Sequence, residues 1–361
     1  MLPPLYPRSI SRAWPPGCPR CQTASVDGDG AGVPTSASAE DLGRQLDEQI
    51  LGPGHLTPAD VAQAVGLPLE VCEQLWVELG FPPVPSDEPL FTDADVEVLR
   101  DLKELQELRM VTFDTIFAMT RVLGQALSRV ATAQVQLSPA TAEAMARPSL
   151  LTELAPEEVK AAVALSMELN ERFIVYSWRR HLAAAVRRQL DPRQVEVIGF
   201  ADLVNYTKLT SRLDDEALPL LLQRFQHAAT QQVAQHGGQV RKLIGDAVLF
   251  VVPDPAQAAL AALDLRDALQ QDPEAPAVRI GLAMGPVVAV EGDIYGDTVN
   301  RASRLAELAR PDSLLVDDAM GNALLDATNL IVRPLRARRV KGLGLVRCWR
   351  VRRPPVESDA S

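Results

Sequence analysis

Hydrophobic residues between residues 41 and 190 recur mainly at intervals of three and four positions, which is the spacing of an amphipathic helix. The segment Thr57-Pro58-Ala59-Asp60 is typical of a helix start, with a capping hydroxyl, a proline at the first helical position and a carboxylate at the third. We therefore predict an all-α N-terminal half. Its expected helices run from residue 58 to a stop at Gly66, over 69–79, from a cap at Thr92 through Leu105, and from Phe113 through Leu127.

A single long helix is predicted over residues 157–190, which Pro156 opens and Asp191-Pro192 ends. With a rise of about 1.5 Å per residue it would span about 50 Å, so we expect it to pair with another helix. We interpret it as a coupling element between two halves of the chain. The arginines near its end predict a solvated basic face, and His181 is either part of that face or a proton-sensitive point.

The pattern changes to alternating strands and helices after residue 193. Gly245-Asp246 separates the apolar runs QVRKLI and AVLFVV and predicts a two-residue hairpin turn. The resulting order, β-α-β-β-α-β with further elements after it, predicts a ferredoxin-like core, so the chain is assigned to the α+β class. The other expected strands are 195–201, 278–284, 314–316 and 346–351, and the expected helices are a stretch ending at His236, 256–271 and 297–309.

The net charge of −11 argues against general nucleic-acid binding, which needs a basic excess. A helix–glycine–helix arrangement in the first half resembles a DNA reader, but its second helix carries Glu70, Glu73 and Glu78 and no Lys or Arg, which favours a packing module. No apolar run reaches the roughly 18 residues of a membrane span, and no signal peptide is recognisable. The four cysteines are too sparse for a disulfide framework, so we expect a cytoplasmic protein.

These patterns divide the chain into five segments. The first is rich in Pro, Gly, Ser and Ala, and we interpret its Cys18 and Cys21 as part of an inert tail, since no second cysteine pair follows. The segments are a disordered tail (1–40), an all-helical domain (41–156), a coupling helix (157–192), an α/β domain (193–353) and a flexible tail (354–361).

Two aspartates occupy positions where strands end. Asp202 follows the apolar strand VEVIGFA, and Asp246 lies at the tip of the predicted hairpin. If the hairpin pairs beside the first strand, the two carboxylates converge. With a backbone carbonyl they would form a hard-oxygen site for Mg²⁺ or Mn²⁺. Taken alone, each aspartate is more typical of a turn or a helix cap than of a metal ligand.

A second cluster lies in GDIYGDTVNRASR, residues 292–304. Asn300 and Arg304 are four residues apart and share a helix face, where an amide and a guanidinium can hold a ribose and a phosphate. Asp293 precedes this helix in a loop and can accept a hydrogen bond from an exocyclic amine. Lys341 adds a cation for a polyphosphate. The alternative is a helix cap with a solvated arginine and lysine.

Four ordered segments, FADLVNYT, GGQVRKLIGD, GDIYGDTVNRASR and RRVKG, resemble the class III adenylate/guanylate cyclase catalytic domain over about residues 193–353. The resemblance implies that Asp202, Asp246 and the carbonyl of Leu203 bind two Mg²⁺ or Mn²⁺ ions. It also implies that Lys242 and Asp293 recognise adenine, because guanylate-selective members carry Glu and Cys or similar residues there. Lys242 and Asp246 are then not an ion pair but parts of two different sites.

The same resemblance implies that Asn300 orients the ribose, Arg304 stabilises charge on the transferring phosphoryl group and Lys341 holds the terminal phosphates. The reaction would convert ATP to cyclic AMP and pyrophosphate by intramolecular phosphoryl transfer. Sites in this family form between two catalytic domains paired head to tail, which implies a homodimer here. Two segments depart from the family pattern: Asn205-Tyr206-Thr207 replaces Gly-Phe-Thr, and Pro286 follows Gly285 in place of an arginine.

The helical half is similar to the regulatory domain of actinobacterial pH-responsive adenylate cyclases. That resemblance implies relief of inhibition at acid pH through a helical rearrangement, with residues 157–190 as the switch element. Two alternatives stay open: a guanylate cyclase, and a non-catalytic nucleotide sensor fused to a helix-turn-helix module.

Overall fold

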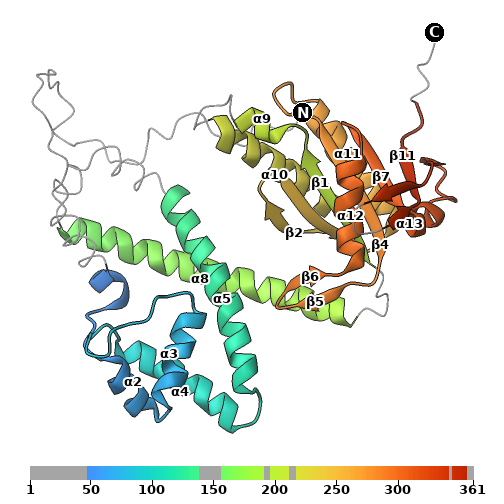
Figure 1. Ribbon diagram of the computed structural model, residues 1–361. Coiled ribbons are helices and arrows are strands. Elements are labelled where there is room, and N and C mark those ends of the chain that lie inside the picture. The colour runs from blue at the N-terminus through green and yellow to red at the C-terminus, as the bar shows by residue number, and fades with distance from the viewer. Residues whose placement is uncertain (1–46, 138–155, 191–195, 211–216, 341–343, 356–361) are drawn as a thin grey trace, which may run out of the picture.

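The computed structural model describes residues 47–137, 156–190, 196–210, 217–340 and 344–355 (Figure 1). A helical half and an α/β half are joined through one long helix. No helix in these ranges is long and apolar enough to cross a membrane. The expected N-terminal tail with Cys18 and Cys21, and residues 356–361 of the expected C-terminal tail, lie outside the described residues.

The N-terminal half is helical, as predicted, and its helices begin at the expected caps. Thr57 and Thr92 each form a capping box with the aspartate three residues later, and Gly66 ends its helix in the left-handed conformation with φ 71°. Val61, Val65, Phe91 and Val96 form a small core. The helices are α2 (Pro58–Val65), α3 (Leu69–Glu78), α4 (Asp93–Glu107) and α5 (Phe113–Leu137), the last running about ten residues past its expected end.

The long helix α8 (Pro156–Gln189) confirms the prediction over 157–190. It crosses α5 in Figure 1, and a hydrogen bond of 3.0 Å from Gln134 to Asn170 joins the two helices. Its apolar residues are largely exposed, Phe173 and Trp178 among them. Contact with α5 therefore leaves much of the apolar surface of the described part of α8 uncovered.

The C-terminal half contains a seven-stranded sheet in the order β2-β3-β1-β4-β7-β11-β8. Its first four strands, with helices α10 and α11 between them, reproduce the β-α-β-β-α-β order and confirm the predicted ferredoxin-like core. The strands are β1 (Glu196–Leu203), β2 (Gln239–Ile244), β3 (Ala247–Val252), β4 (Val278–Gly285), β7 (Ser313–Asp317), β8 (Ile331–Pro334) and β11 (Cys348–Arg352), and the helices are α10 (Ala217–Gln235) and α11 (Pro255–Gln270).

Helices cover the sheet differently on its two faces. Residues of α10 and α11 pack with alternate residues of the central strands to form the larger core, which includes Phe225 and Phe250. On the other face, α12 (Asp297–Leu308) lies against β4. A Cβ on Gly281 would lie 2.3 Å from the carbonyl oxygen of Ala302, so the glycine permits this close approach. The sheet face under α12 also carries the candidate site.

Several elements differ from the expectation. β1 continues to Leu203, so Asp202 is a paired strand residue and does not follow the strand. The segment before α12 forms a hairpin of β5 (Val288–Val290) and β6 (Asp293–Tyr295) instead of the predicted loop, because Glu291 and Gly292, with φ of 50° and 81°, form a tight turn between two strand-forming stretches. The elements not predicted at all are α13 (Asp318–Ala323), β8, β9 (Arg338–Val340) and β10 (Gly344–Val346). The short helix α9 (Tyr206–Thr210) lies within the helical stretch expected to end at His236.

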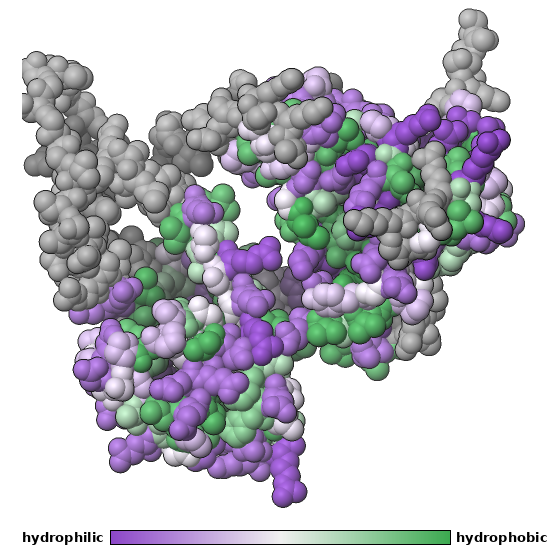
Figure 2. Space-filling model, viewed as in Figure 1, coloured by the Kyte–Doolittle hydropathy of each residue, from purple (hydrophilic) through white to green (hydrophobic). Residues whose placement is uncertain are grey.

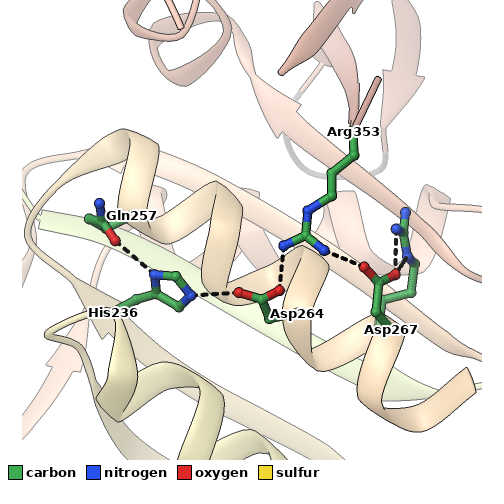
Figure 3. Close-up of polar contacts among 6 residues, drawn as sticks. His236, Gln257, Asp264, Asp267 and Arg353 are labelled. Atoms are coloured by element: carbon green, nitrogen blue, oxygen red, sulfur yellow. Dashed lines mark hydrogen bonds and ion pairs between the residues drawn. The ribbon is translucent and has the colours of Figure 1, made fainter. Parts of the chain in front are cut away.

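A chain of charged side chains fastens the end of the sheet to α11 (Figure 3). Arg353, just after β11, pairs with Asp264 and Asp267, and Asp264 also contacts Nε2 of His236 at 2.7 Å. Burial acts to raise the pKa of Asp264, but hydrogen bonds from Arg353 and His236 outweigh it and hold the pKa below its usual range. Asp264 is therefore expected to contribute stability near neutral pH that is lost as acid protonates it.

Candidate functional site

The carboxylates of Asp202 and Asp246 are brought together by the pairing of β1 with β3. Asp202 lies opposite Ala247, the first residue of β3, and Asp246 is the preceding residue in the hairpin turn. The amide of Leu203 donates a hydrogen bond of 3.2 Å to the carbonyl oxygen of Asp246. The main chain thus holds the hairpin tip against the end of β1, which produces the expected convergence.

These two carboxylates form an acidic pair in a partly buried position. Burial raises the pKa of Asp202, the negative charge and hydrogen bond of Asp246 raise it further, and Arg279 acts in the opposite direction. Neighbouring carboxylates repel each other, and a hard cation relieves that repulsion while taking the oxygen ligands it prefers. The pair therefore fits Mg²⁺ or Mn²⁺, although no group of three or more His, Cys, Asp or Glu suited to a metal occurs in the described residues.

Lys242 and Asp293 form a second pair on the same half of the molecule. Lys242 lies on β2 and Asp293 begins β6, and the distance from Nζ to Oδ2 is 2.6 Å. This hydrogen bond raises the pKa of Lys242 and lowers the pKa of Asp293, so both groups are charged at neutral pH. The other carboxylate oxygen, Oδ1, accepts from the amide of Ile294 at 2.9 Å, which fixes the orientation of the aspartate.

No ion pair joins Lys242 to Asp246 within the described ranges, in agreement with the prediction. The two residues are close in sequence, but Lys242 pairs with Leu249 across the hairpin, whereas Asp246 lies at its tip. Lys242 thus takes its partner from a segment about fifty residues away in the chain, not from its own hairpin.

Asn300 and Arg304 both lie on the exposed side of α12. The guanidinium of Arg304 donates to both carboxylate oxygens of Glu307 at 2.7 Å. Between them, Arg301 binds the buried carboxylate of Asp317 at 2.9 Å, and this carboxylate also caps α13. Arg301 therefore fixes α12 against the end of β7 and so fixes the position of Asn300. Sequence reasoning did not find this contact.

The two clusters do not meet within one chain. Asp202 lies opposite Arg279 at one end of β4, whereas Thr298 of α12 packs on Gly285 at the other end. Six residues of strand separate those ends, a distance of about 20 Å. Asn300 lies only two residues beyond Thr298, so it is roughly 15–20 Å from the acidic pair. The predicted metal half and the predicted ribose half are thus separate surfaces of a single chain.

The remaining predicted residues have mixed outcomes. Lys341 lies outside the described residues, so its role stays a prediction. Asn205 has a left-handed backbone with φ 61°, a conformation that asparagine tolerates better than most residues, so it can replace the glycine of the family pattern. Pro286 offers its carbonyl to the hydroxyl of Thr298 at 2.7 Å, which anchors the start of α12.

One ion pair connects the helical half to this site. Arg121 of α5 binds Glu78 of α3 through two nitrogens, at 2.7 and 2.9 Å, and donates a third hydrogen bond of 2.7 Å to Glu291. Glu291 lies in the β5–β6 turn, two residues before Asp293. The charge of Arg129, also on α5, acts to lower the pKa of Lys242, so the helix lies within electrostatic range of that lysine.

Two protein families match the chain. The family described as adenylate and guanylate cyclase catalytic domain matches residues 191–352. The family described as adenylate cyclase regulatory domain matches residues 36–171 and therefore extends into the first half of α8. The first match therefore covers the α/β half, and the second covers most of the helical half.

Relatives resemble the chain over most of its length. An adenylate cyclase of Streptomyces coelicolor is 31% identical over 366 residues, covering 90% of this chain and 95% of the relative. An adenylate cyclase of Streptomyces griseus is 34% identical, with 79% and 72% covered. A pH-sensitive adenylate cyclase of Mycobacterium tuberculosis is 30% identical, with 83% and 78% covered. Among solved structures, the guanylate cyclase domain of RhGC from Catenaria anguillulae is 27% identical over 45% of this chain and 97% of that domain, with a TM-score of 0.42.

Proposed function

The chain belongs to the adenylate and guanylate cyclase family, and from this membership we propose that it converts ATP to cyclic AMP and pyrophosphate. In the proposed reaction the ribose 3′-oxygen forms a bond to the α-phosphorus. The bond from that phosphorus to the oxygen bridging to the β-phosphorus breaks, and pyrophosphate leaves. The sparse cysteines favour a cytoplasmic location, as the sequence predicted.

The observation that carries the preference for ATP is the Lys242–Asp293 pair. It places a donor and an acceptor 2.6 Å apart, held by β2 and β6. Adenine presents an amine donor at position 6, where guanine presents a carbonyl acceptor. The carboxylate of Asp293 can accept from the adenine amine, with Lys242 donating to the adjacent ring nitrogen. Guanine would place its carbonyl oxygen against the carboxylate, so the pair disfavours GTP.

Asp202 and Asp246 would hold two Mg²⁺ or Mn²⁺ ions, with Leu203 supplying a backbone carbonyl. Such ions would neutralise the triphosphate and lower the pKa of the attacking hydroxyl. Asn300 would orient the ribose, and Arg304 would release Glu307 to stabilise charge on the transferring phosphoryl group. Lys341 would bind the terminal phosphates. The chain's contribution is positioning and electrostatics, which suffices for phosphoryl transfer.

The proposal includes a homodimer, because Asn300 lies roughly 15–20 Å from the acidic pair in one chain. A second chain placed head to tail would bring its Asn300 to the acidic pair of the first. Exposed apolar side chains offer surfaces for this contact, on the β5–β6 hairpin in Figure 2 and along α8. They include Val288, Val290 and Tyr295 on the hairpin and Leu165, Leu169, Phe173, Tyr176 and Val186 on α8.

Incubation of the purified full-length chain with Mn²⁺ and either ATP or GTP tests this function. We expect cyclic AMP and pyrophosphate from ATP, and a much lower rate of cyclic GMP formation from GTP. Chromatography of the products measures both. A chain that forms neither product under these conditions would refute the enzyme proposal, and a higher rate with GTP would establish a guanylate cyclase instead.

We also propose that the helical half restrains the catalytic half through Arg121. Gly124 lets α5 approach the carbonyl of Leu79 closely, since a Cβ there would lie 2.2 Å from that oxygen, so Arg121 projects from a rigid support. Its bond to Glu291 holds the hairpin that presents Asp293. The hydrogen bond from Arg121 lowers the pKa of Glu78, so the Arg121–Glu78 pair stays charged near neutral pH.

Glu291→Gln removes the ion pair between Arg121 and Glu291 and leaves the Arg121–Glu78 pair in place. Because a partly exposed ion pair contributes about 0.2–1 kcal/mol, we expect cyclase activity near pH 7.5 to rise about two- to fivefold. Steady-state rates with Mn²⁺ and ATP measure the effect. Glu274→Gln is the matched control, because Glu274 also accepts from an arginine, Arg224, at 2.7 Å but within the catalytic half. Unchanged or reduced activity in Glu291→Gln would contradict the restraint.

A further inference from the structure

Arg279 lies next to the acidic pair and takes no part in the reaction as proposed. It is opposite Asp202 in the antiparallel β1–β4 ladder, and its guanidinium donates to Oδ2 of that aspartate. Both side chains are partly buried, with 28% of Arg279 and 22% of Asp202 exposed. A permanent cation therefore touches the carboxylate assigned to metal binding.

The position of Arg279 on the sheet explains this contact. Residues alternate between the faces of a strand, so Arg279 shares its face with Gly281 and Ala283, the face against which α12 packs. Asp202 shares that face with Ile198 and Phe200 on the neighbouring strand. The two charged side chains are thus fixed side by side by the ladder, and neither depends on a loop for its position.

The guanidinium of Arg279 is incompletely satisfied. Its Nε is buried and has no hydrogen-bond partner in the described part of the chain. Arg121 and Arg353, by contrast, each use several nitrogens to bind two carboxylates. A purely structural ion pair gains most from a two-pronged contact, which Arg279 does not make. Its arrangement places one positive charge on one oxygen of Asp202 and leaves Nε buried without a partner in the described part of the chain.

We propose that Arg279 is a built-in counter-cation of the acidic pair, which a divalent ion must displace from Asp202, so that Arg279 sets the metal affinity of the site. This inference rests on the proposed function, because it takes Asp202 and Asp246 as metal ligands. In the metal-free chain Arg279 offsets the repulsion between the two carboxylates. A divalent ion can bind both oxygens of Asp202 only after the guanidinium has moved away from this carboxylate. The ion and the guanidinium then repel each other, because both are positively charged.

Removal of this charge is expected to tighten metal binding. Even at the dielectric constant of water, a unit charge about 5 Å from a divalent ion changes its affinity by on the order of tenfold. Arg279→Gln should therefore lower the dissociation constant for Mn²⁺ about tenfold. Arg279→Lys keeps the charge and should leave the constant within about twofold of the wild-type value. Titration of free Mn²⁺, followed by its electron paramagnetic resonance signal, measures binding to the full-length chain without ATP and without turnover.

Two further variants distinguish an error in the assignment of the metal site from an error in the role proposed for Arg279. Arg224→Gln breaks a surface arginine pair with Asp272 and Glu274 and should not alter Mn²⁺ binding. Asp202→Asn should abolish binding at the site. If Asp202→Asn binds Mn²⁺ as the wild type does, the metal site itself is wrong. If Asp202→Asn loses binding but Arg279→Gln has an unchanged or weaker affinity, only the role of Arg279 is overturned.

A measurement on the unmodified side chain covers the case in which Arg279→Gln does not fold. The chain is labelled with ¹³C at the Cζ atom of its arginines. The signal of Arg279 is then identified as the one that is missing from the spectrum of Arg279→Lys. Addition of Mg²⁺ to the wild-type chain should shift this signal as the guanidinium leaves Asp202. A signal that stays in place while Mg²⁺ saturates the site would overturn the proposal.

Discussion

Asp202→Ala and Asn300→Ala chains, each inactive alone, are expected to regain about a quarter of the wild-type cyclase activity when mixed in equal amounts and allowed to exchange. The reason is that Asn300 lies roughly 15–20 Å from the acidic pair within one chain. One substitution damages the metal half, and the other damages the ribose half. A mixed dimer therefore still has one intact copy of each.

The expected fraction follows from the geometry of a head-to-tail dimer. Half of the dimers formed by random exchange contain one chain of each kind. In such a dimer one site combines both damaged halves, and the other combines the metal half of the Asn300→Ala chain with the ribose half of the Asp202→Ala chain. Only that second site is intact, so about one site in four is active. Cyclic AMP production from Mn²⁺ and ATP, measured before and after exchange, gives this fraction.

A mixture of Asp202→Ala with Asp246→Ala chains provides the matched control. Both substitutions damage the metal half, so every site in every mixed dimer lacks one carboxylate, and no activity should return. Equal recovery in the two mixtures, or no recovery in the first while size measurements show that mixed dimers form, would contradict sites shared between chains.

The topology of the catalytic half could be predicted because its signals are local. Continuous apolar runs marked β1, β3 and β4, and the two residues between QVRKLI and AVLFVV marked the hairpin. The convergence of Asp202 and Asp246 then followed from the pairing of adjacent strands. An aspartate at the end of an apolar strand is nevertheless not always a metal ligand. Asp317 also ends an apolar strand, yet its buried carboxylate binds Arg301 and caps α13. Only the contacts separate a structural aspartate from a candidate ligand.

The contacts that sequence reasoning missed join distant segments. Arg121 and Glu291 are separated by 170 residues, and neither lies in a recognisable motif. Arg279 follows the first residue of an apolar strand, where an arginine is ordinarily interpreted as a solvated side chain, and only the register of β1 and β4 sets it beside Asp202. The β5–β6 hairpin resembles a loop in the sequence because each strand has three residues, too few to show an alternating pattern. Local patterns carry no information about such pairings.

Lys242→Glu combined with Asp293→Cys is expected to change the substrate preference from ATP to GTP. In the wild-type pair Lys242 donates and Asp293 accepts. The double variant places an acceptor where the donor was, and it removes the negative charge that repels the guanine carbonyl. Sites built to hydrogen-bond one base reject another by large factors, so the ratio of kcat/KM for ATP to kcat/KM for GTP should fall by at least about a thousandfold. Because it is a ratio, any general loss of activity cancels.

The control for this pair is a second ion pair of similar length. Arg224→Glu with Glu274→Cys alters a surface pair of 2.7 Å in the same domain and should leave the preference unchanged. In each single variant, one of the two residues matches adenine and the other matches guanine. Both single variants should therefore have a low kcat/KM with ATP and with GTP. A double variant that still prefers ATP as strongly as the wild type would contradict this role. The 2.6 Å pair would then be a structural contact between β2 and β6 that does not select the base.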